Sequence, residues 1–392
     1  MLFSLDKISI IAFTIFSMVI SIDPTGSIWG IKELLFVFLL LLSFISFGKG
    51  DTIPKDVLFA IWVCLSLPMW GIMIAVLKDN FTDSSYAFGH LKSFLFILIF
   101  FFLRNLNFDK IVKVLFINGS LIALFTTLIF IIAQINQELF SLLFDQSLEN
   151  DNIIISEREY YGFSVLGVYF KTGPFMFFSY IYSLYFLDIK HFRGVLILLN
   201  LFALLVAGSR TPTLIAILIT VIYFYDRMKS NRLFKYAILY ACGFALAFLT
   251  YKLATEKGEI SNELKFADFH SYISNIFMNT TPVVGAGLGS EFYSGGRGQL
   301  VAASEQTYMD IIRIYGFFLG IVLIILIYYP ALAFLRSKYW HILKYRRFIM
   351  AYILYMILAG TNPLLISSTG MLIWAVGLTF VYKIHKRQLK MD

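Results

Sequence analysis

Long apolar runs follow one another along almost the whole chain, and they constrain the fold more than any other feature. A helix needs roughly 20 largely apolar residues to cross a hydrocarbon core of about 30 Å. In lipid every backbone amide needs a partner inside the spanning structure, and no alternating pattern typical of barrel strands occurs, so the runs predict helices. Only 14% of the residues are charged, whereas soluble domains have about a quarter. The chain is therefore predicted to be an all-α integral membrane protein.

About twelve transmembrane helices are expected, and they would form a single polytopic membrane domain over residues 1–392. The first apolar run has only Lys7 before it and no small-residue cleavage site after it, so it is predicted to be a retained helix. The predicted segments are 8–22, 29–47, 57–77, 87–103, 111–134, 172–188, 194–208, 212–225, 235–251, 307–329, 348–365 and 369–384.

The distribution of charge predicts the orientation of these helices. With both termini in the cytoplasm, 21 of the 32 lysines and arginines fall on the cytoplasmic side, as the positive-inside rule requires. Most acidic residues fall on the outer side. The net charge of +8 is thus a signal of topology, and we do not interpret it as nucleic-acid binding.

Two predicted outer loops are long enough to form a site. The loop 135–171 contains Arg158 between two glutamates, where the arginine either binds substrate or balances its neighbours. The larger loop, 252–306, precedes the tenth helix, and apolar residues at helical spacing over 261–278 predict an amphipathic helix on the membrane surface. The cytoplasmic loops are short, so the chemistry or binding is expected on the outer side.

The larger loop is rich in glycine. Gly285, Gly287 and Gly289 are predicted to form a tight turn that brings backbone amides close to a ligand, the alternative being a flexible loop. The run reads Gly-x-Gly-x-Gly, whereas the dinucleotide-binding fingerprint is Gly-x-Gly-x-x-Gly. No predicted strand precedes it either, so it does not match that fingerprint. Arg297, which lies among three further glycines, either binds an anion or is an exposed loop residue. The cysteines and histidines show no metal-ligand spacing.

A second polar turn separates two short apolar segments, 194–208 and 212–225. At about 1.5 Å per residue each would reach only about 21–23 Å, so the turn is expected below the outer surface. Thr211 is predicted to cap a new helix, with Pro212 in its first turn. Arg210 would then lie recessed beside helix amides, which is a suitable site for a diphosphate; the alternative is a structural arginine.

The tenth helix begins near Glu305, which follows Ser304. Glu305 is either a base or positioning group at the outer mouth, or a simple partner of the helix dipole. Asp310 and Arg313 share one helix face, and we expect them to form a structural ion pair. Tyr308 and Arg313 are also candidates for substrate binding.

Taken together, these features resemble the O-antigen polymerase (Wzy) and O-antigen ligase superfamily. The resemblance rests on the Gly-Ser-Arg-Thr turn between short helices, the late loop with Gly-x-Gly-x-Gly-Ser, and Ser-Glu-Gln-Thr-Tyr leading into a helix with Tyr315-Gly316-x-x-Leu319-Gly320. It covers about 195–330, and the first five segments match only in general character.

The resemblance implies a glycosyltransferase of the bacterial inner membrane that uses neither a metal nor another cofactor. A polymerase of this kind transfers a growing glycan from undecaprenyl diphosphate to the non-reducing end of a lipid-linked repeat unit, and a chain-length regulator is a possible partner. The related ligases use two arginines for the diphosphate, which by position are Arg210 and Arg297, and a histidine in the late loop. Glu305 stands near the place of that histidine, which favours a polymerase.

Three alternatives remain. The chain could be an O-antigen ligase. It could also be a flippase or another transporter for lipid-linked oligosaccharides, although such proteins often contain internal repeats and the two halves here show no similarity. A membrane scaffold without catalytic activity would leave a recessed Arg210 without a purpose.

Overall fold

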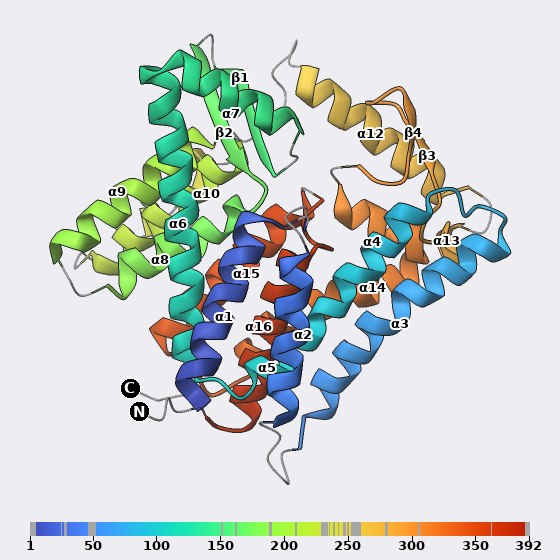
Figure 1. Cartoon of the computed structure of the whole chain (residues 1–392), viewed down its shortest axis with the longest axis horizontal. Coiled ribbons are helices and arrows are strands. Elements are labelled where there is room, and N and C mark those ends of the chain that lie inside the picture. The colour runs from blue at the N-terminus through green and yellow to red at the C-terminus, as the bar shows by residue number, and fades with distance from the viewer. Residues whose placement is uncertain are drawn as a thin grey trace. The chain divides into compact units, whose positions relative to one another are not determined.

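The chain is mostly helical in its computed structural model (Figure 1). The structure describes residues 5–24, 26, 30–45, 52–149, 152–160, 163–187, 190–207, 210–228, a scattered few from 234 to 251, 260–278, 281–304, 306–361 and 363–388. The predicted ninth segment, 235–251, therefore lies largely outside the described residues. Two compact units form, one from Met1–Val114 with Glu263–Asp392 and one from Leu115–Asn262. The single polytopic membrane domain over 1–392 stays a prediction.

The first unit contains most of the long helices and the larger outer loop. Its elements are α1 (Leu5–Ile22), α2 (Ile31–Ile45), α3 (Lys55–Leu77), α4 (Ser84–Leu95), the 3-10 helix η1 (Phe96–Ile99), α5 (Phe100–Leu103), the start of α6 (Phe108–Ile135), α12 (Ile260–Ile276), α13 (Thr281–Val284), β3 (Phe292–Ser294), β4 (Gln299–Val301), α14 (Thr307–Leu335), α15 (Leu343–Gly360) and α16 (Ser368–His385).

Contacts between helix ends show that α16 runs antiparallel to both α1 and α3. At one end, the start of α3 meets the end of α16 where Asp56 Oδ2 lies 3.0 Å from His385 Nε2. At the other end, the hydroxyl of Ser368, at the start of α16, donates to the carbonyl of Pro24 after α1 at 3.0 Å. This is the arrangement expected of consecutive spans, each of which reverses the direction of the one before it.

Four helical stretches are long and apolar enough to cross a membrane among the described residues: Lys55–Leu77, Ser84–Leu103, Phe108–Ile135 and Thr307–Leu335. Large apolar side chains are exposed on them, including Trp62, Met69 and Phe318, the last with 75% of its surface accessible. Such side chains would be costly in water and are suited to lipid. The helices thus indicate a membrane protein, and the predicted number of twelve spans stays an expectation.

The second unit contains the rest of α6, α7 (Gln137–Glu149), β1 (Ile153–Tyr160), β2 (Phe163–Phe170), the 3-10 helix η2 (Gly173–Phe175), α8 (Met176–Tyr185), α9 (Lys190–Val206) and α10 (Arg210–Arg227). Gly119 lets α6 pack closely on η2 and α8, because a Cβ there would lie 2.3 Å from the carbonyl oxygen of Phe175 and 2.8 Å from the Cβ of Ser179. The hydroxyls of Tyr180 and Thr220 join α8 to α10 at 2.6 Å.

Three predictions for this unit need correction. The segment 172–188 is helical over 13 of its described residues, the 3 of η2 followed directly by the 10 of α8, so the helix is shorter than the predicted segment. The helices α9 and α10 have 17 and 18 residues, so they are longer than the apolar segments alone suggest. The helix α10 already includes Arg210 and Thr211, so Thr211 lies in the first turn with Pro212 and is not the N-cap.

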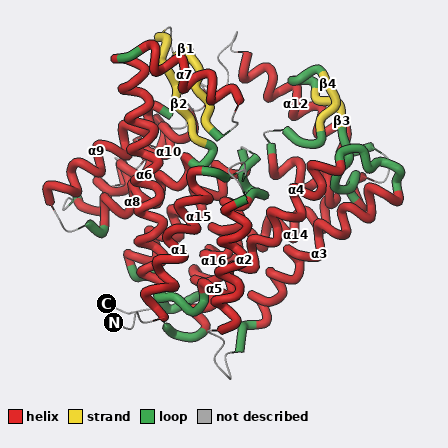
Figure 2. Tube along the Cα trace, in the orientation of Figure 1, coloured by secondary structure: helices red, strands yellow, loops and turns green. Residues whose placement is uncertain are grey.

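Two antiparallel hairpins add strands to the predicted all-α fold, and both lie in predicted outer loops (Figure 2). In the first, Ile153 pairs with Phe170 and Tyr160 with Phe163. In the second, Phe292 pairs with Val301 and Ser294 with Gln299. Strands can form here because neither hairpin belongs to a predicted spanning segment, so the lipid constraint does not apply to its edges.

Candidate functional site

The late loop is folded on α12, the helix that the sequence predicts over 261–278. The inner face of α12 presents Asp268 and Ser271 to the turn between β3 and β4. Asp268 accepts hydrogen bonds from the hydroxyl of Ser294 and from the amide of Gly296, the latter at 3.1 Å, and Ser271 accepts one from the amide of Gly295 at 2.9 Å. The glycine-rich turn is thus fixed by side chains of the preceding helix.

A buried cluster joins the end of this loop to α14. Arg313 is fully buried and donates to Asp310 Oδ1 at 3.2 Å, to the carbonyl oxygen of Ser290 at 3.1 Å and to the carbonyl oxygen of Ala302. Its guanidinium also lies 4.7 Å from the ring centroid of Phe292. The expected Asp310 and Arg313 ion pair is confirmed, and the arginine holds both sides of the β3–β4 hairpin.

Tyr272 extends this cluster to α12. Its hydroxyl accepts a hydrogen bond from the amide of Ser304 at 3.0 Å and also hydrogen-bonds Asp310. Burial, together with the negative charge of Asp310, raises the pKa of Tyr272. The hydroxyl therefore stays protonated at neutral pH and donates to the carboxylate. The same amide of Ser304 reaches Asp310 Oδ2 at 3.3 Å, so the segment that leads into α14 is fixed from two sides.

The glycine run packs between α3 and α14. Gly285, Gly287 and Gly289 all have positive φ, at 84°, 94° and 93°. A Cβ on Gly287 would lie 2.3 Å from the backbone nitrogen of Ala75. Only glycine satisfies both conditions, because other residues are strained at positive φ and the side chain would overlap the neighbouring backbone.

The amides in this run are bonded to the protein itself. Ala286 and Gly287 donate to the carbonyl oxygens of Arg313 and Ile314, at 2.7 and 3.1 Å. These carbonyls are available because α14 breaks at Gly316, which has φ 76° and ψ 170°. The predicted tight turn is present, and the amides of Ala286 and Gly287 complete the backbone hydrogen bonds of the broken helix α14.

A cavity of about 200 Å³ lies beside the start of α14. One wall comes from α4, a second from the end of the late loop with the first turn of α14, and a third from the segment between α15 and α16. Its lining residues are Tyr86, Gly89, His90, Ser93, Ala303, Ser304, Thr307, Asp310, Pro363 and Ile366. The volume is below the roughly 300–1,000 Å³ typical of drug-sized ligands, and it suits one sugar ring or one part of a larger substrate.

His90 is the residue of this cavity that the sequence interpretation misses. It is half-buried on α4, with its ring 4.7 Å from the centroid of Tyr86 and 6.0 Å from that of Phe94. No hydrogen bond involves its imidazole among the residues that the structure describes. The available signal is its position inside the predicted span 87–103, since an ionisable residue at membrane depth is by default a functional candidate.

The buried hydroxyl of Ser304 is a second indication that this cavity binds a polar ligand. Ser304 is 2% exposed, and its Oγ has no hydrogen-bond partner within the described part of the chain. Buried hydroxyls are nearly always hydrogen-bonded to protein or water. A polar molecule in the cavity would satisfy this oxygen.

Two other predicted residues lie away from the cavity lining. Arg297 is exposed in the turn between β3 and β4, and its amide donates to the hydroxyl of Ser294 at 3.0 Å. Tyr308 packs α14 against α15, where its hydroxyl donates to the carbonyl oxygen of Met356 at 2.9 Å and hydrogen-bonds Tyr328.

The remaining predicted residues have no described side chain. Glu305 lies outside the described residues, although its neighbour Ser304 lines the cavity. Arg210 begins α10 in the second unit. Arg158 pairs with Val165 in the first hairpin through its backbone.

No cofactor or metal is assigned by these contacts. Within the described residues, no three histidine, cysteine, aspartate or glutamate side chains come together as metal ligands would.

When the chain is compared with protein-family models, with curated proteins and with solved structures, it matches none of them.

Proposed function

We propose that the chain is a glycosyltransferase of the polysaccharide-polymerase kind, placed in a bacterial cytoplasmic membrane with both termini inside. It would transfer a growing glycan from undecaprenyl diphosphate to the non-reducing end of a lipid-linked repeat unit, and a chain-length regulator would be its partner. The observation that carries this proposal is the cavity of about 200 Å³ in which His90 and Ser304 meet at the end of the late loop.

The reaction needs one proton acceptor and one stabiliser of negative charge. The acceptor hydroxyl oxygen attacks the anomeric carbon of the donor glycan, the bond from that carbon to the diphosphate oxygen breaks, and the diphosphate leaves with the electron pair. The hydroxyl proton passes to a base. His90 is one candidate base because it lines the cavity, and Glu305 is the other because it follows Ser304. General-base assistance contributes about 10²–10⁴-fold to such a step.

The leaving diphosphate calls for fixed cations. Arg210 and Arg297 stay the predicted diphosphate-binding residues, since a guanidinium donates two parallel hydrogen bonds to phosphate oxygens. Arg297 is exposed in the β3–β4 turn, and Arg210 belongs to the second unit. Charge that develops on the leaving oxygens is stabilised most where water is excluded. The acidic outer loops repel anions in general, so binding would depend on these few arginines.

A ligase is the second candidate, and His90 is the observation that favours it. The resemblance associates ligases with a histidine of the late loop that activates the acceptor. His90 lies on α4 and not in that loop, but it lines the cavity at the end of the loop. The two functions differ in the acceptor, which is a lipid-linked repeat unit for a polymerase and the lipopolysaccharide core for a ligase.

The glycan ladder of cells that lack the gene distinguishes these functions. For a polymerase, the null strain accumulates single repeat units, and wild-type protein restores the ladder. For a ligase, long polymer still forms but stays on the lipid carrier. An unchanged ladder, or repeat units retained on the inner leaflet, would contradict both and indicate a transporter.

Variants in the same strain identify the base. Complementation with His90→Ala and with Glu305→Ala, each expressed at the wild-type level, shows which residue the ladder requires. Ser85→Ala is the matched control, since Ser85 is exposed on α4 and does not line the cavity.

A further inference from the structure

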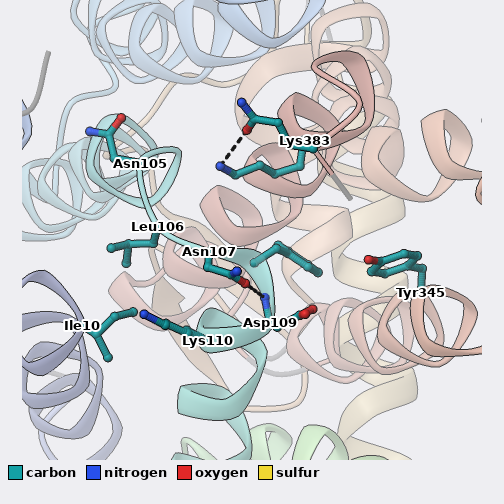
Figure 3. Close-up of a pocket in the computed structure, with 10 residues that line it drawn as sticks. Ile10, Asn105, Leu106, Asn107, Asp109, Lys110, Tyr345 and Lys383 are labelled. Atoms are coloured by element: carbon teal, nitrogen blue, oxygen red, sulfur yellow. Dashed lines mark hydrogen bonds between the residues drawn. The ribbon is translucent and has the colours of Figure 1, made fainter. Parts of the chain in front are cut away.

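A second cavity, of about 290 Å³, lies where α5 leads into α6 and α16 ends (Figure 3). It shares no lining residue with the cavity at Ser304. Ser368, near the first cavity, and Lys383, in the second, are separated by 15 residues of α16, or roughly 22 Å of helix. The two cavities therefore lie at opposite ends of this helix.

Apolar and polar side chains both line the second cavity. Ile10, Leu106 and Phe108 contribute apolar surface. Asn105, Asn107, Lys110, Lys383 and Gln388 contribute polar groups, and Figure 3 shows the side chains of Lys383 and Lys110 on different sides of the space. A ligand with a polar head beside a short apolar part fits such a lining.

The charges of this cavity favour an anion. Lys383 is 8% exposed and donates to the carbonyl oxygen of Arg104 at 2.7 Å and to Gln388 Oε1 at 3.0 Å. Lys110 is exposed on α6. Among the described residues that line the cavity, Asp109 is the one carboxylate, and it forms an ion pair with Lys344 at 2.6 Å. Its negative charge is thus balanced, and a positive field remains.

The carboxamides present donors. Asn107 Oδ1 accepts a hydrogen bond from the amide of Asp109 at 2.8 Å, and Gln388 Oε1 accepts the one from Lys383. With both oxygens used in this way, each NH₂ group is left to donate. Ammonium and amide groups around one cavity can donate hydrogen bonds to phosphate oxygens. Such bonds to a charged acceptor are stronger than those between neutral groups.

We propose that this cavity binds the phosphate group of an anionic amphiphile, such as the headgroup of a phospholipid at the membrane surface. The lysines and carboxamides that line the cavity would hold the phosphate, and Ile10, Leu106 and Phe108 would contact the glycerol and the first methylenes. This inference is independent of the proposed function, because it uses none of the residues assigned to glycosyl transfer.

The test is a binding titration with the full-length protein in detergent. The probes are inorganic phosphate, short-chain phosphatidylglycerol and a short-chain diacylglycerol without phosphate. Binding is measured by calorimetry and by the shift in the unfolding temperature. We expect phosphatidylglycerol to bind and diacylglycerol not to bind. If inorganic phosphate binds as tightly as phosphatidylglycerol, the phosphate site stands and its natural ligand is a soluble anion.

Charge reversal on α6 supplies the matched variants. Lys110→Glu removes a cation that lines the cavity, whereas Lys113→Glu makes the same change at an exposed position of the same helix outside the lining. Loss of one charged hydrogen bond is expected to weaken phosphatidylglycerol binding about tenfold or more in Lys110→Glu, with no change in Lys113→Glu. Equal effects of the two variants, or no binding of either phosphate probe to wild type, would overturn the proposal.

Discussion

Arg313 donates to Asp310 at 3.2 Å, and the two charges lie one turn apart on α14, where both side chains are buried. The same guanidinium binds carbonyl oxygens on both sides of the β3–β4 hairpin, those of Ser290 and Ala302. A buried charge of this kind is tolerated only when it is paired and fully hydrogen-bonded. The pair therefore holds the late loop against the helix that begins at Thr307.

Removal of this guanidinium should strongly destabilise the protein. Arg313→Met leaves Asp310 as a buried charge without its partner, and breaking a buried pair costs about 3–5 kcal/mol. Thermal unfolding in detergent, followed by tryptophan fluorescence, measures the loss. Lys344→Met is the control, because its ion pair with Asp109 is partly exposed and such pairs contribute about 0–1 kcal/mol. Equal losses in the two variants would show that Arg313 does not organise the loop.

Alanine substitutions at two late-loop glycines should distinguish the cost of a positive φ from the cost of a steric clash. Gly287→Ala places a residue at φ 94° with its Cβ against the backbone of Ala75, so it combines an unfavourable φ with a backbone clash. Gly298→Ala also has a positive φ, 64°, but no atom lies within 4 Å of its Cβ. We expect the free energy of unfolding to fall by about 1–2 kcal/mol in Gly298→Ala and by clearly more in Gly287→Ala. A smaller loss in Gly287→Ala would contradict the close packing of this turn on α3.

The raised pKa of Tyr272 predicts how stability depends on alkaline pH. An unfolded tyrosine ionises near pH 10, whereas the folded one stays protonated above it. The contribution of Tyr272 to the free energy of unfolding is thus fully present below a pH of about 10, and it is lost as the pH rises further. Tyr272→Phe should cost about 1 kcal/mol per lost hydrogen bond at neutral pH, and its unfolding temperature should fall less steeply above pH 10 than that of wild type. Tyr293→Phe, at an exposed position of β3, should leave both the stability and the slope unchanged.

The orientation of the chain is testable with reporter fusions. Fusions at residues 150 and 280 should report an outer location, and a fusion after residue 388 a cytoplasmic one. The reason is the excess of lysine and arginine on the predicted cytoplasmic segments. A cytoplasmic signal from residue 150 or 280 would overturn the predicted topology.

Local signals in the sequence identify several elements correctly. The apolar spacing over 261–278 predicts α12, which covers Ile260–Ile276, and the three-residue spacing of Asp310 and Arg313 predicts their ion pair. Both depend on periodicity within one helix. The hairpin β3–β4 is missed because its strands have three residues each, too short for an alternating pattern to stand out.

The cavity could not be derived from the sequence because it depends on distant contacts. His90 and Ser304 are more than 200 residues apart in the chain. They line the same cavity because the glycine run attaches the late loop to α3, which directly precedes α4. That attachment includes the amide of Leu288 bonded to the carbonyl oxygen of Gly71 at 2.8 Å. Glycine composition predicts a turn, but it does not identify the helix on which the turn packs.

The most direct test of the central claim is reconstitution. Purified protein in lipid vesicles is supplied with synthetic repeat units on a polyprenyl diphosphate, and the products are separated by size and identified by mass spectrometry. The account predicts a ladder of longer glycans with release of polyprenyl diphosphate, and a decrease of about 10²-fold or more when the catalytic base is replaced. Repeat units that cross the membrane without growing longer would contradict it.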